Sequence, residues 1–121
     1  MNTNIDKLHK VLDGKLKGRR VGNTFAQCHL IAGYIELAEE LDITQVICKT
    51  NFCNDIQYIL PILESVLNEH GLQIFKFLWS TNSALVEDCN KVTQVTFISK
   101  ERFDEKIIGI NNYVLVDMTH P

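Results

Sequence analysis

The sequence predicts an α/β fold of three layers, in which a mostly parallel sheet of about four strands is flanked by helices. Short runs rich in β-branched and apolar residues alternate with segments whose apolar residues recur every three or four positions. No repeat or long linker interrupts this alternation, and 121 residues of 45% hydrophobic content suit one compact domain. We therefore expect a single domain over residues 1–121, with a basic helix over 1–15 and the α/β core over 16–118.

Apolar residues spaced three and four apart predict the helices. This pattern covers residues 4–12, 24–41 and 55–70. Pro61 lies inside the third segment, so it either kinks that helix or starts it after a looser turn. Residues 100–109 indicate a short helix or a turn.

Four runs of apolar and β-branched residues predict the strands. They cover residues 44–50, 72–80, 92–99 and 113–120. The segment 81–91 is expected to form a loop or one short helix. The last strand carries Asp117 near its carboxyl end, where parallel α/β sheets bind their ligands.

Composition argues against a membrane protein and against a zinc protein. No apolar run approaches the roughly 20 residues that span a bilayer, and the polar N-terminus does not read as a secretory signal. We therefore expect a cytoplasmic protein without a membrane partner. The four cysteines are scattered without a CxxC pair, so free thiols are expected and no zinc.

Positive charge is concentrated at the start of the chain. Residues 1–20 carry six Lys or Arg against two Asp, whereas the remaining 101 residues carry six bases against thirteen acids. An anionic ligand near the basic segment is one explanation, and a solvated basic helix is the other. Tight nonspecific binding of nucleic acid is not expected from a chain whose body is acidic.

The basic segment runs into a glycine loop, "KGRRVGNT" over residues 17–24, that opens the second predicted helix. Gly18 and Gly22 permit positive φ and a close approach of the backbone to a ligand. The first turn of the helix offers free N–H groups and a partial positive charge. Full positive charges come from Lys17, Arg19 and Arg20. The loop is therefore a candidate anion site.

Two short motifs resemble those of P-loop NTPases. The first family motif is GxxxxGK[ST], and Gly22 and Thr24 match its end. The loop is similar to those of viral DNA-packaging terminase motors and helicase-like ATPases. The second motif, an apolar strand that ends in Asp, is similar to "YVLVD" over 113–117. The resemblance covers residues 16–118 and implies a truncated P-loop fold.

The resemblance implies a phosphate site and a metal site. Gly22 and the N–H groups after it would cradle a phosphate, with Thr24 as a Mg²⁺ ligand and Asp117 holding that ion through water. The implied phosphate-binding residues are Lys17, Gly18, Arg19, Arg20, Gly22, Asn23 and Thr24.

Several positions depart from the family pattern. Asn23 stands in place of the P-loop lysine, and Lys17 stands in place of the leading glycine. Met118 stands where hydrolysing members place a glutamate that orients water. Arg19 or Arg20 is the candidate substitute for the missing lysine. These departures remove charge stabilisation and water activation, so efficient hydrolysis is not expected.

Other chemically capable residues have structural explanations. His29 and Cys28 fall on or beside the apolar face of the second helix, so we expect packing or a surface position rather than catalysis. For Cys53 and His70 the sequence indicates no partner residue. Trp79 suits a core or rim aromatic, and stacking on a base is the alternative.

The leading functional hypothesis is a P-loop-like domain, inactive or weakly active in hydrolysis, that binds a nucleotide or another phosphate ligand. Its small size and eroded motifs fit a viral accessory or regulatory protein. The alternative is an interaction protein that uses the fold as a scaffold for a protein partner. A sheet with an unpaired edge also favours a homodimer.

Overall fold

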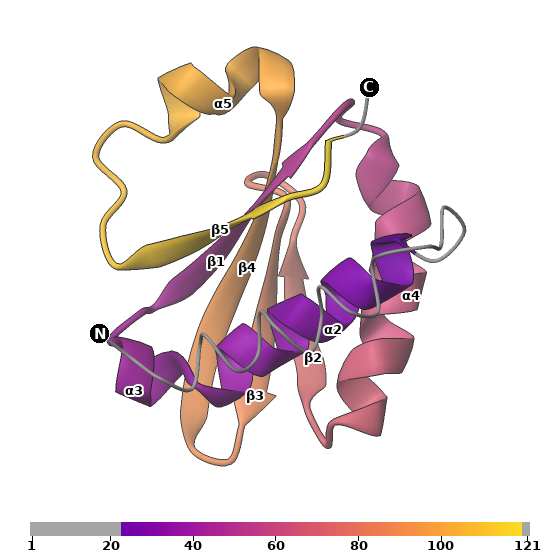
Figure 1. Ribbon diagram of the computed structural model, residues 1–121, viewed down its shortest axis with the longest axis vertical. Helices are drawn as coiled ribbons and strands as arrows, with labels where there is room; N and C mark the ends of the chain where they lie inside the picture. Colours follow the sequence, from indigo (N-terminus) through magenta and orange to yellow (C-terminus); the bar gives the residue numbers. More distant parts are fainter. Residues whose placement is uncertain (1–22, 120–121) are drawn as a thin grey trace.

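The computed structural model describes residues 23–119 (Figure 1), so the predicted basic helix over 1–15 lies outside the described residues. The described helices are α2 (Asn23–Glu36), α3 (Ala38–Leu41), α4 (Asp55–Glu69) and α5 (Lys100–Lys106). The strands are β1 (Gln45–Thr50), β2 (Gln73–Leu78), β3 (Ser83–Asp88), β4 (Lys91–Ser99) and β5 (Tyr113–Asp117).

The strands form one mixed sheet in the order β2-β3-β4-β1-β5. β4 and β5 both pair parallel with β1, whereas β3 pairs antiparallel with both β2 and β4. The α/β class is therefore confirmed. The prediction of a mostly parallel sheet of about four strands was wrong, because the sheet has five strands and half of its pairings are antiparallel.

The strand that the sequence prediction missed is β3, which lies in the segment expected to be a loop or short helix. Asn82 and Cys89 flank it with positive φ angles of 50° and 56°. This left-handed geometry reverses the chain within a few residues at each end, so a strand fits into a short segment. Since β3 runs against both neighbours, β2 and β4 still point in the same direction as β1 and β5.

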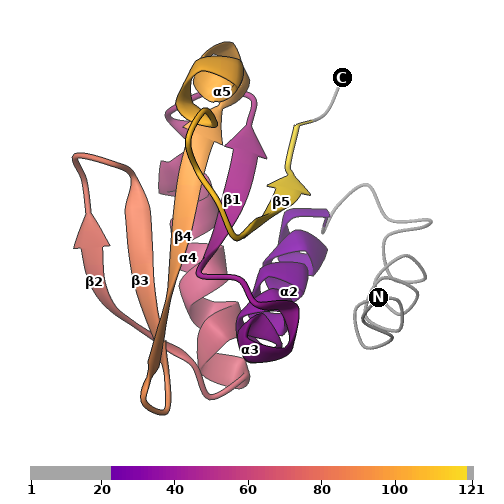
Figure 2. The same cartoon turned by 90° about the vertical axis from the view of Figure 1, so that its left-hand side faces the viewer.

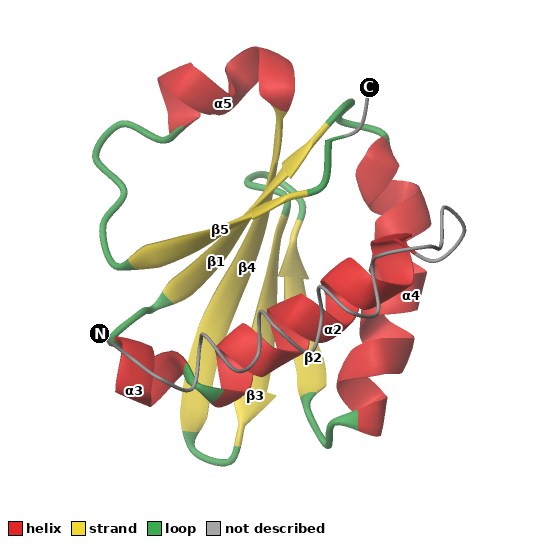
Figure 3. Ribbon diagram, in the orientation of Figure 1, coloured by secondary structure: helices red, strands yellow, loops and turns green. Residues whose placement is uncertain are grey.

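The main core lies between the sheet and the helices α2 and α4, which share one face of the sheet (Figure 3). On the helices the buried residues sit at helical spacing; on the strands they alternate. The helices contribute Cys28, Ile31, Ile35, Ile56, Ile59, Leu63, Val66 and Leu67, and the strands contribute Val46, Cys48, Ala84, Val86, Val95, Phe97 and Val116.

One helix prediction needs correction, and one of two open alternatives is excluded. The helix expected over 24–41 is divided into α2 and α3 at Leu37, whose backbone (φ −99°, ψ 9°) departs from helical geometry. α4 continues through Pro61, so Pro61 does not start that helix. Burial of Ile59, Leu63 and other residues on one face of α4 offsets the backbone hydrogen bond that the proline removes. Among the described helices, none has the length and apolar composition of a membrane span.

The second face of the sheet is covered at one end by α5. Along β1, Val46 and Cys48 point into the main core, so Gln45, Ile47 and Lys49 point to the opposite face. The Lys49 Nζ atom lies 4.8 Å from the centre of the Phe103 ring, which places α5 over this face. Figure 2 shows α5 at the end of the sheet where β1 and β4 terminate.

The four cysteines are expected to divide into two reactive and two unreactive thiols. Burial raises the pKa of Cys28 to about 12 and raises the pKa of Cys48 well above its ordinary value. Cys53 and Cys89 are exposed. Because the thiolate is the nucleophile, an aromatic disulfide reagent should label two thiols in the native chain and four in denaturant.

The control is a Cys53→Ser, Cys89→Ser variant, which should show almost no labelling until it is unfolded. Rapid labelling of a third thiol in the native protein would show that the core does not close around Cys28 and Cys48.

Candidate functional site

The candidate site lies where the connections from β1 and β4 diverge. These two strands are parallel neighbours, paired from Gln45–Gln94 to Thr50–Ser99. After Thr50 the chain enters α4 on one face of the sheet, and after Ser99 it enters α5 on the other face. In α/β sheets a crevice forms at such a topological switch point, outside the carboxyl ends of the strands.

A cavity of about 760 Å³ opens at this position and extends along the sheet to Gln45, the first residue of β1. Its walls come from three separate segments: residues 52–54 between β1 and α4, residues 80–82 between β2 and β3, and the α5 side chains of Glu101, Arg102 and Lys106. The volume falls within the range of pockets that hold small organic ligands. Three connections that are distant in the sequence thus meet around one cavity.

The floor of the cavity is a network of uncharged polar side chains on β1, β3 and β4. Gln94 Nε2 donates to Ser83 Oγ and to Thr96 Oγ1, at 3.0 Å each. The two hydroxyl oxygens lie 3.0 Å apart, where either can donate, and Thr96 Oγ1 is also within 3.4 Å of its acceptor Gln45 Oε1. Ser83 is fully buried and Thr96 nearly so. Such a connected network fixes the positions of its members.

Charge is confined to the α5 wall. Arg102 and Lys106 lie one helical turn apart and both line the cavity, together with Glu101. The cations therefore exceed the acids by one among the lining residues, and the rest of the polar lining is uncharged. An anionic group is favoured at the α5 end and a neutral polar group over the floor.

The loop before α4 is held by its own hydrogen bonds. Thr50 Oγ1 donates to the carbonyl of Phe52, and the N–H of Phe52 donates to Asp55 Oδ2, both over 3.0 Å. These bonds fix the loop while the Phe52 ring remains 68% exposed at the rim of the cavity. An exposed ring on a fixed loop can pack against a ligand that binds at this end of the cavity.

The structure describes only part of the predicted phosphate loop. Lys17, Gly18, Arg19, Arg20 and Gly22 lie outside the described residues. Asn23 and Thr24 form the start of α2. The first turns of α2 lie beside the end of β5, because Gln27 Nε2 donates to the main-chain carbonyl of Asp117 over 3.0 Å.

Asp117 lies near α2, but its carboxylate points to the other face of the sheet. Val116 is buried in the main core, so its neighbour Asp117 points away from α2, beside Lys49. The carboxylate accepts hydrogen bonds from the hydroxyl and the N–H of Thr119. The Thr119 hydroxyl lowers the pKa of Asp117, and the charge of Lys49 adds to that effect.

Met118, the residue after Asp117, belongs to the core and not to a site. Met118 is buried, with 5% of its surface exposed, and packs in the main core. Within residues 23–119, no group of three or more His, Cys, Asp and Glu side chains has the geometry to hold a metal ion. Trp79 is 66% exposed and packs against Phe77 with ring centres 4.4 Å apart, so it is a surface aromatic and not a core residue.

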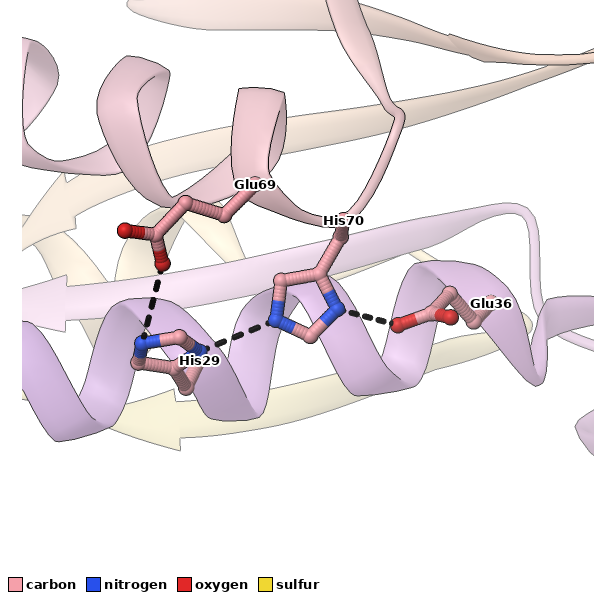
Figure 4. A network of polar contacts seen from close by, with 4 residues as sticks. All are labelled: His29, Glu36, Glu69 and His70. Atoms are coloured by element: carbon pink, nitrogen blue, oxygen red, sulfur yellow. Dashed lines mark hydrogen bonds and ion pairs between the residues drawn. The ribbon is translucent and has the colours of Figure 1, made fainter.

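A polar chain that the sequence did not predict links α2 to α4 (Figure 4). His29 Nδ1 lies 2.9 Å from His70 Nε2, and His70 Nδ1 lies 2.6 Å from Glu36 Oε1. On the other side, His29 Nε2 lies 3.8 Å from Glu69 Oε2. The Phe25 ring packs edge-on against His29, with ring centres 4.6 Å apart.

The carboxylates determine how protons are arranged in this chain. A carboxylate only accepts, so His70 must carry a proton on Nδ1 to bond Glu36. In the neutral pair, His70 Nε2 then accepts from His29 Nδ1, and His29 Nε2 presents no proton to Glu69. One added proton supplies that missing donor. The pair therefore joins the two helices in either protonation state.

No family model, curated protein or solved structure matches the chain. The P-loop resemblance stays a prediction that rests on residues 17–24 and 113–117. Of these segments, the structure describes Asn23, Thr24 and all of β5.

Asp117→Asn is expected to reduce the loss of stability in acid. The folded-state pKa of Asp117 lies below its ordinary value of 3.8, so the unfolded chain binds this proton more readily. The stabilisation is therefore complete above that value and is lost as pH falls through the folded-state pKa. Melting curves between pH 7 and pH 2 should show the wild-type advantage shrinking at the acid end.

Asp104→Asn is the matched control for this measurement. Asp104 is also exposed, and none of the hydrogen bonds and ion pairs described above involves it. A wild-type advantage over Asp117→Asn that stays constant with pH would contradict the role assigned to Thr119.

His29 and His70 are expected to be energetically coupled. Hydrogen bonds of this kind contribute about 0.5–1.5 kcal/mol each. A double-mutant cycle with His29→Ala and His70→Ala, measured by urea unfolding, should therefore give a coupling energy of about 1 kcal/mol. A cycle of His29→Ala with Asn68→Ala, an exposed position on α4, should give a value near zero.

Equal coupling energies in the two cycles would show that the His29–His70 contact contributes nothing specific to the packing of α2 on α4.

Proposed function

We propose that this protein is a small domain that binds a nucleotide or another phosphate-bearing ligand in the cavity over β1 and β4, without efficient hydrolysis. The observation that carries the proposal is the position of the cavity at the switch point between these two parallel strands. Its size and its mixed lining suit a ligand with both charged and neutral parts.

The phosphate group would bind at the α5 end of the cavity. Arg102 and Lys106 both line this wall and can reach one anionic group from adjacent turns of the helix. The lining residues 52–54 also lead directly into α4, a helix of 15 residues whose first N–H groups carry a partial positive charge. The carboxylate of Asp55 in the first turn of α4 offsets this partial charge, so Arg102 and Lys106 are the main source of positive potential at this end of the cavity.

The predicted loop at 17–24 offers a second location for the phosphate. Its support is the closeness of the first turns of α2 to the end of β5. Its weakness is the carboxylate of Asp117, which faces away from α2 and is held by Thr119. Thr24 and Asp117 therefore do not fit a shared Mg²⁺ site in this arrangement, and we assign no step to that ion.

Binding without efficient turnover follows from the residues at the two motif positions. Asn23 carries no charge that could bridge two phosphates, and Met118 carries no group that could orient water. The side chain of Met118 is also buried in the core and is not among the residues that line the cavity.

The proposal is tested by a thermal-shift screen with nucleoside mono-, di- and triphosphates and with inorganic pyrophosphate. A ligand at 100 times its Kd stabilises the folded state by about 2.7 kcal/mol, which raises Tm by several degrees in a domain of this size. Arg102→Ala combined with Lys106→Ala should lower the affinity at least tenfold, since each cation contacts the same anion. Lys100→Ala is the control, because Lys100 lies on α5 outside the cavity.

Two cysteines report the location of binding in the same protein. Cys53 lines the cavity, whereas Cys89 lies in the turn between β3 and β4. A bound ligand should therefore slow alkylation of Cys53 several-fold and leave alkylation of Cys89 unchanged, which peptide mass spectrometry can follow.

Three results would redirect the proposal. Loss of binding with Arg20→Ala or Gly22→Ala, but not with the α5 variants, would locate the site in the loop 17–24. Loss of only Mg²⁺-dependent binding with Thr24→Ala would support the predicted metal role. A failure of every phosphate ligand to shift Tm would favour the scaffold hypothesis, for which the exposed Phe75 on the edge strand β2 is the relevant surface feature.

A further inference from the structure

We infer that Gln94 and Gln45 recognise a neutral, planar group that carries an N–H donor, such as a nucleobase, at the end of the cavity opposite the α5 cations. This inference rests on the proposed function and specifies the class of its ligand. It follows from the directions of the hydrogen bonds among the polar side chains of the cavity floor and from the register of β1 and β4.

The hydroxyl of Ser83 favours one orientation of the Gln94 amide. Ser83 Oγ carries one proton, which it can donate to the carbonyl of Thr81 over 3.2 Å or to Thr96 Oγ1 over 3.0 Å. With its proton on Thr81 or Thr96, Ser83 Oγ accepts from the Gln94 NH₂ group, which lies 3.0 Å away. The same NH₂ group also reaches Thr96 Oγ1 over 3.0 Å.

This orientation leaves an acceptor of Gln94 for a ligand. Both hydrogen bonds of the Gln94 side chain among the described residues use Nε2, so Oε1 remains available over the floor. An amide oxygen in a cavity that becomes enclosed when a ligand binds needs a donor, because a buried acceptor without one costs about 1–3 kcal/mol. A ligand that brings an N–H group is therefore favoured over one that brings only acceptors.

Gln45 lies beside this acceptor and is less constrained. It is the register partner of Gln94 on the adjacent strand, and its only described side-chain bond is the 3.4 Å contact with Thr96. Its amide can therefore rotate to present either an acceptor or a donor. A fixed acceptor next to an adaptable amide matches the edge of a nucleobase, where a donor and an acceptor stand side by side.

The distance along the strands separates the neutral end from the charged end. Five residues of β4 lie between Gln94 and the start of α5 after Ser99, which is roughly 16 Å of extended chain. The long side chains of Arg102 and Lys106 span part of this length. The ligand is therefore elongated, with an anion at one end and an uncharged ring at the other.

The test compares nucleoside monophosphates with ribose 5-phosphate and inorganic pyrophosphate, by calorimetry on the full chain. The wild type should bind at least one of AMP, GMP, CMP and UMP about tenfold more tightly than ribose 5-phosphate, which lacks the base. Gln94→Leu should reduce this ratio to about one while leaving pyrophosphate affinity within twofold. Gln57→Leu, at an exposed position on α4, is the matched control.

Gln45→Leu keeps the test decisive if Gln94→Leu disturbs the floor, since Gln45 makes only the one long contact. This variant should reduce the ratio of nucleotide affinity to ribose 5-phosphate affinity severalfold. Equal binding of nucleotides and ribose 5-phosphate by the wild type, or a ratio unchanged in both variants, would overturn this inference and leave the proposed phosphate site intact. If neither nucleotides nor pyrophosphate bind, the inference and the proposed function both fail.

Discussion

The parallel pairing of β1 with β4 is the constraint on which the rest of the structure depends. A parallel pair cannot be closed by a tight turn, so each strand must leave the sheet through a crossover. β1 leaves through α4 and β4 leaves through α5, and these helices cover opposite faces. Val46, Ile47 and Val95 are fully buried along the pair, which fixes its register. The cavity follows from this arrangement, because neither helix closes the space directly above the two strand ends.

The pairing also separates the apolar and polar faces of the sheet. Because side chains alternate along a strand, the register that buries Val46 and Val95 also brings Gln45 beside Gln94 on the other face. A shift of one residue would put amides into the main core and leave valines over the cavity. The hydrophobic burial that stabilises the fold thus also determines the positions of the polar groups over the cavity. The strand register alone aligns Gln45 with Gln94.

Local pattern in the sequence predicted the elements better than it predicted their arrangement. The β-branched content of β1 and β4 and the helical spacing of α2 and α4 identified all four, because those signals are contained within each segment. β3 was missed, since its six residues end in Glu87 and Asp88 and its turns depend on the left-handed backbone of Asn82 and Cys89. The mixed direction of the sheet was missed with it.

The cavity could not be predicted from the sequence, because residues 52–54, 80–82 and 101–106 carry no shared motif and meet only through the sheet register. The same limit explains why His29 and His70 showed no partner: their contact depends on how α2 lies against α4.

The distribution of charge around the cavity limits what kind of ligand selectivity it can produce. A carboxylate or an ammonium group on the floor would need a paired charge when a ligand excluded water, whereas an amide needs only a hydrogen-bond partner. Ser83 and Thr96 accept hydrogen bonds from the Gln94 NH₂ group. The carbonyl oxygen of the same amide is left to accept a hydrogen bond from a ligand. Attraction of an anion to Arg102 and Lys106 is long-ranged and similar for any phosphate, so it contributes affinity with little discrimination. Discrimination must then come from the short-range, directional bonds of the two glutamines, because a ligand that fails to satisfy them loses those bonds without losing the attraction to α5.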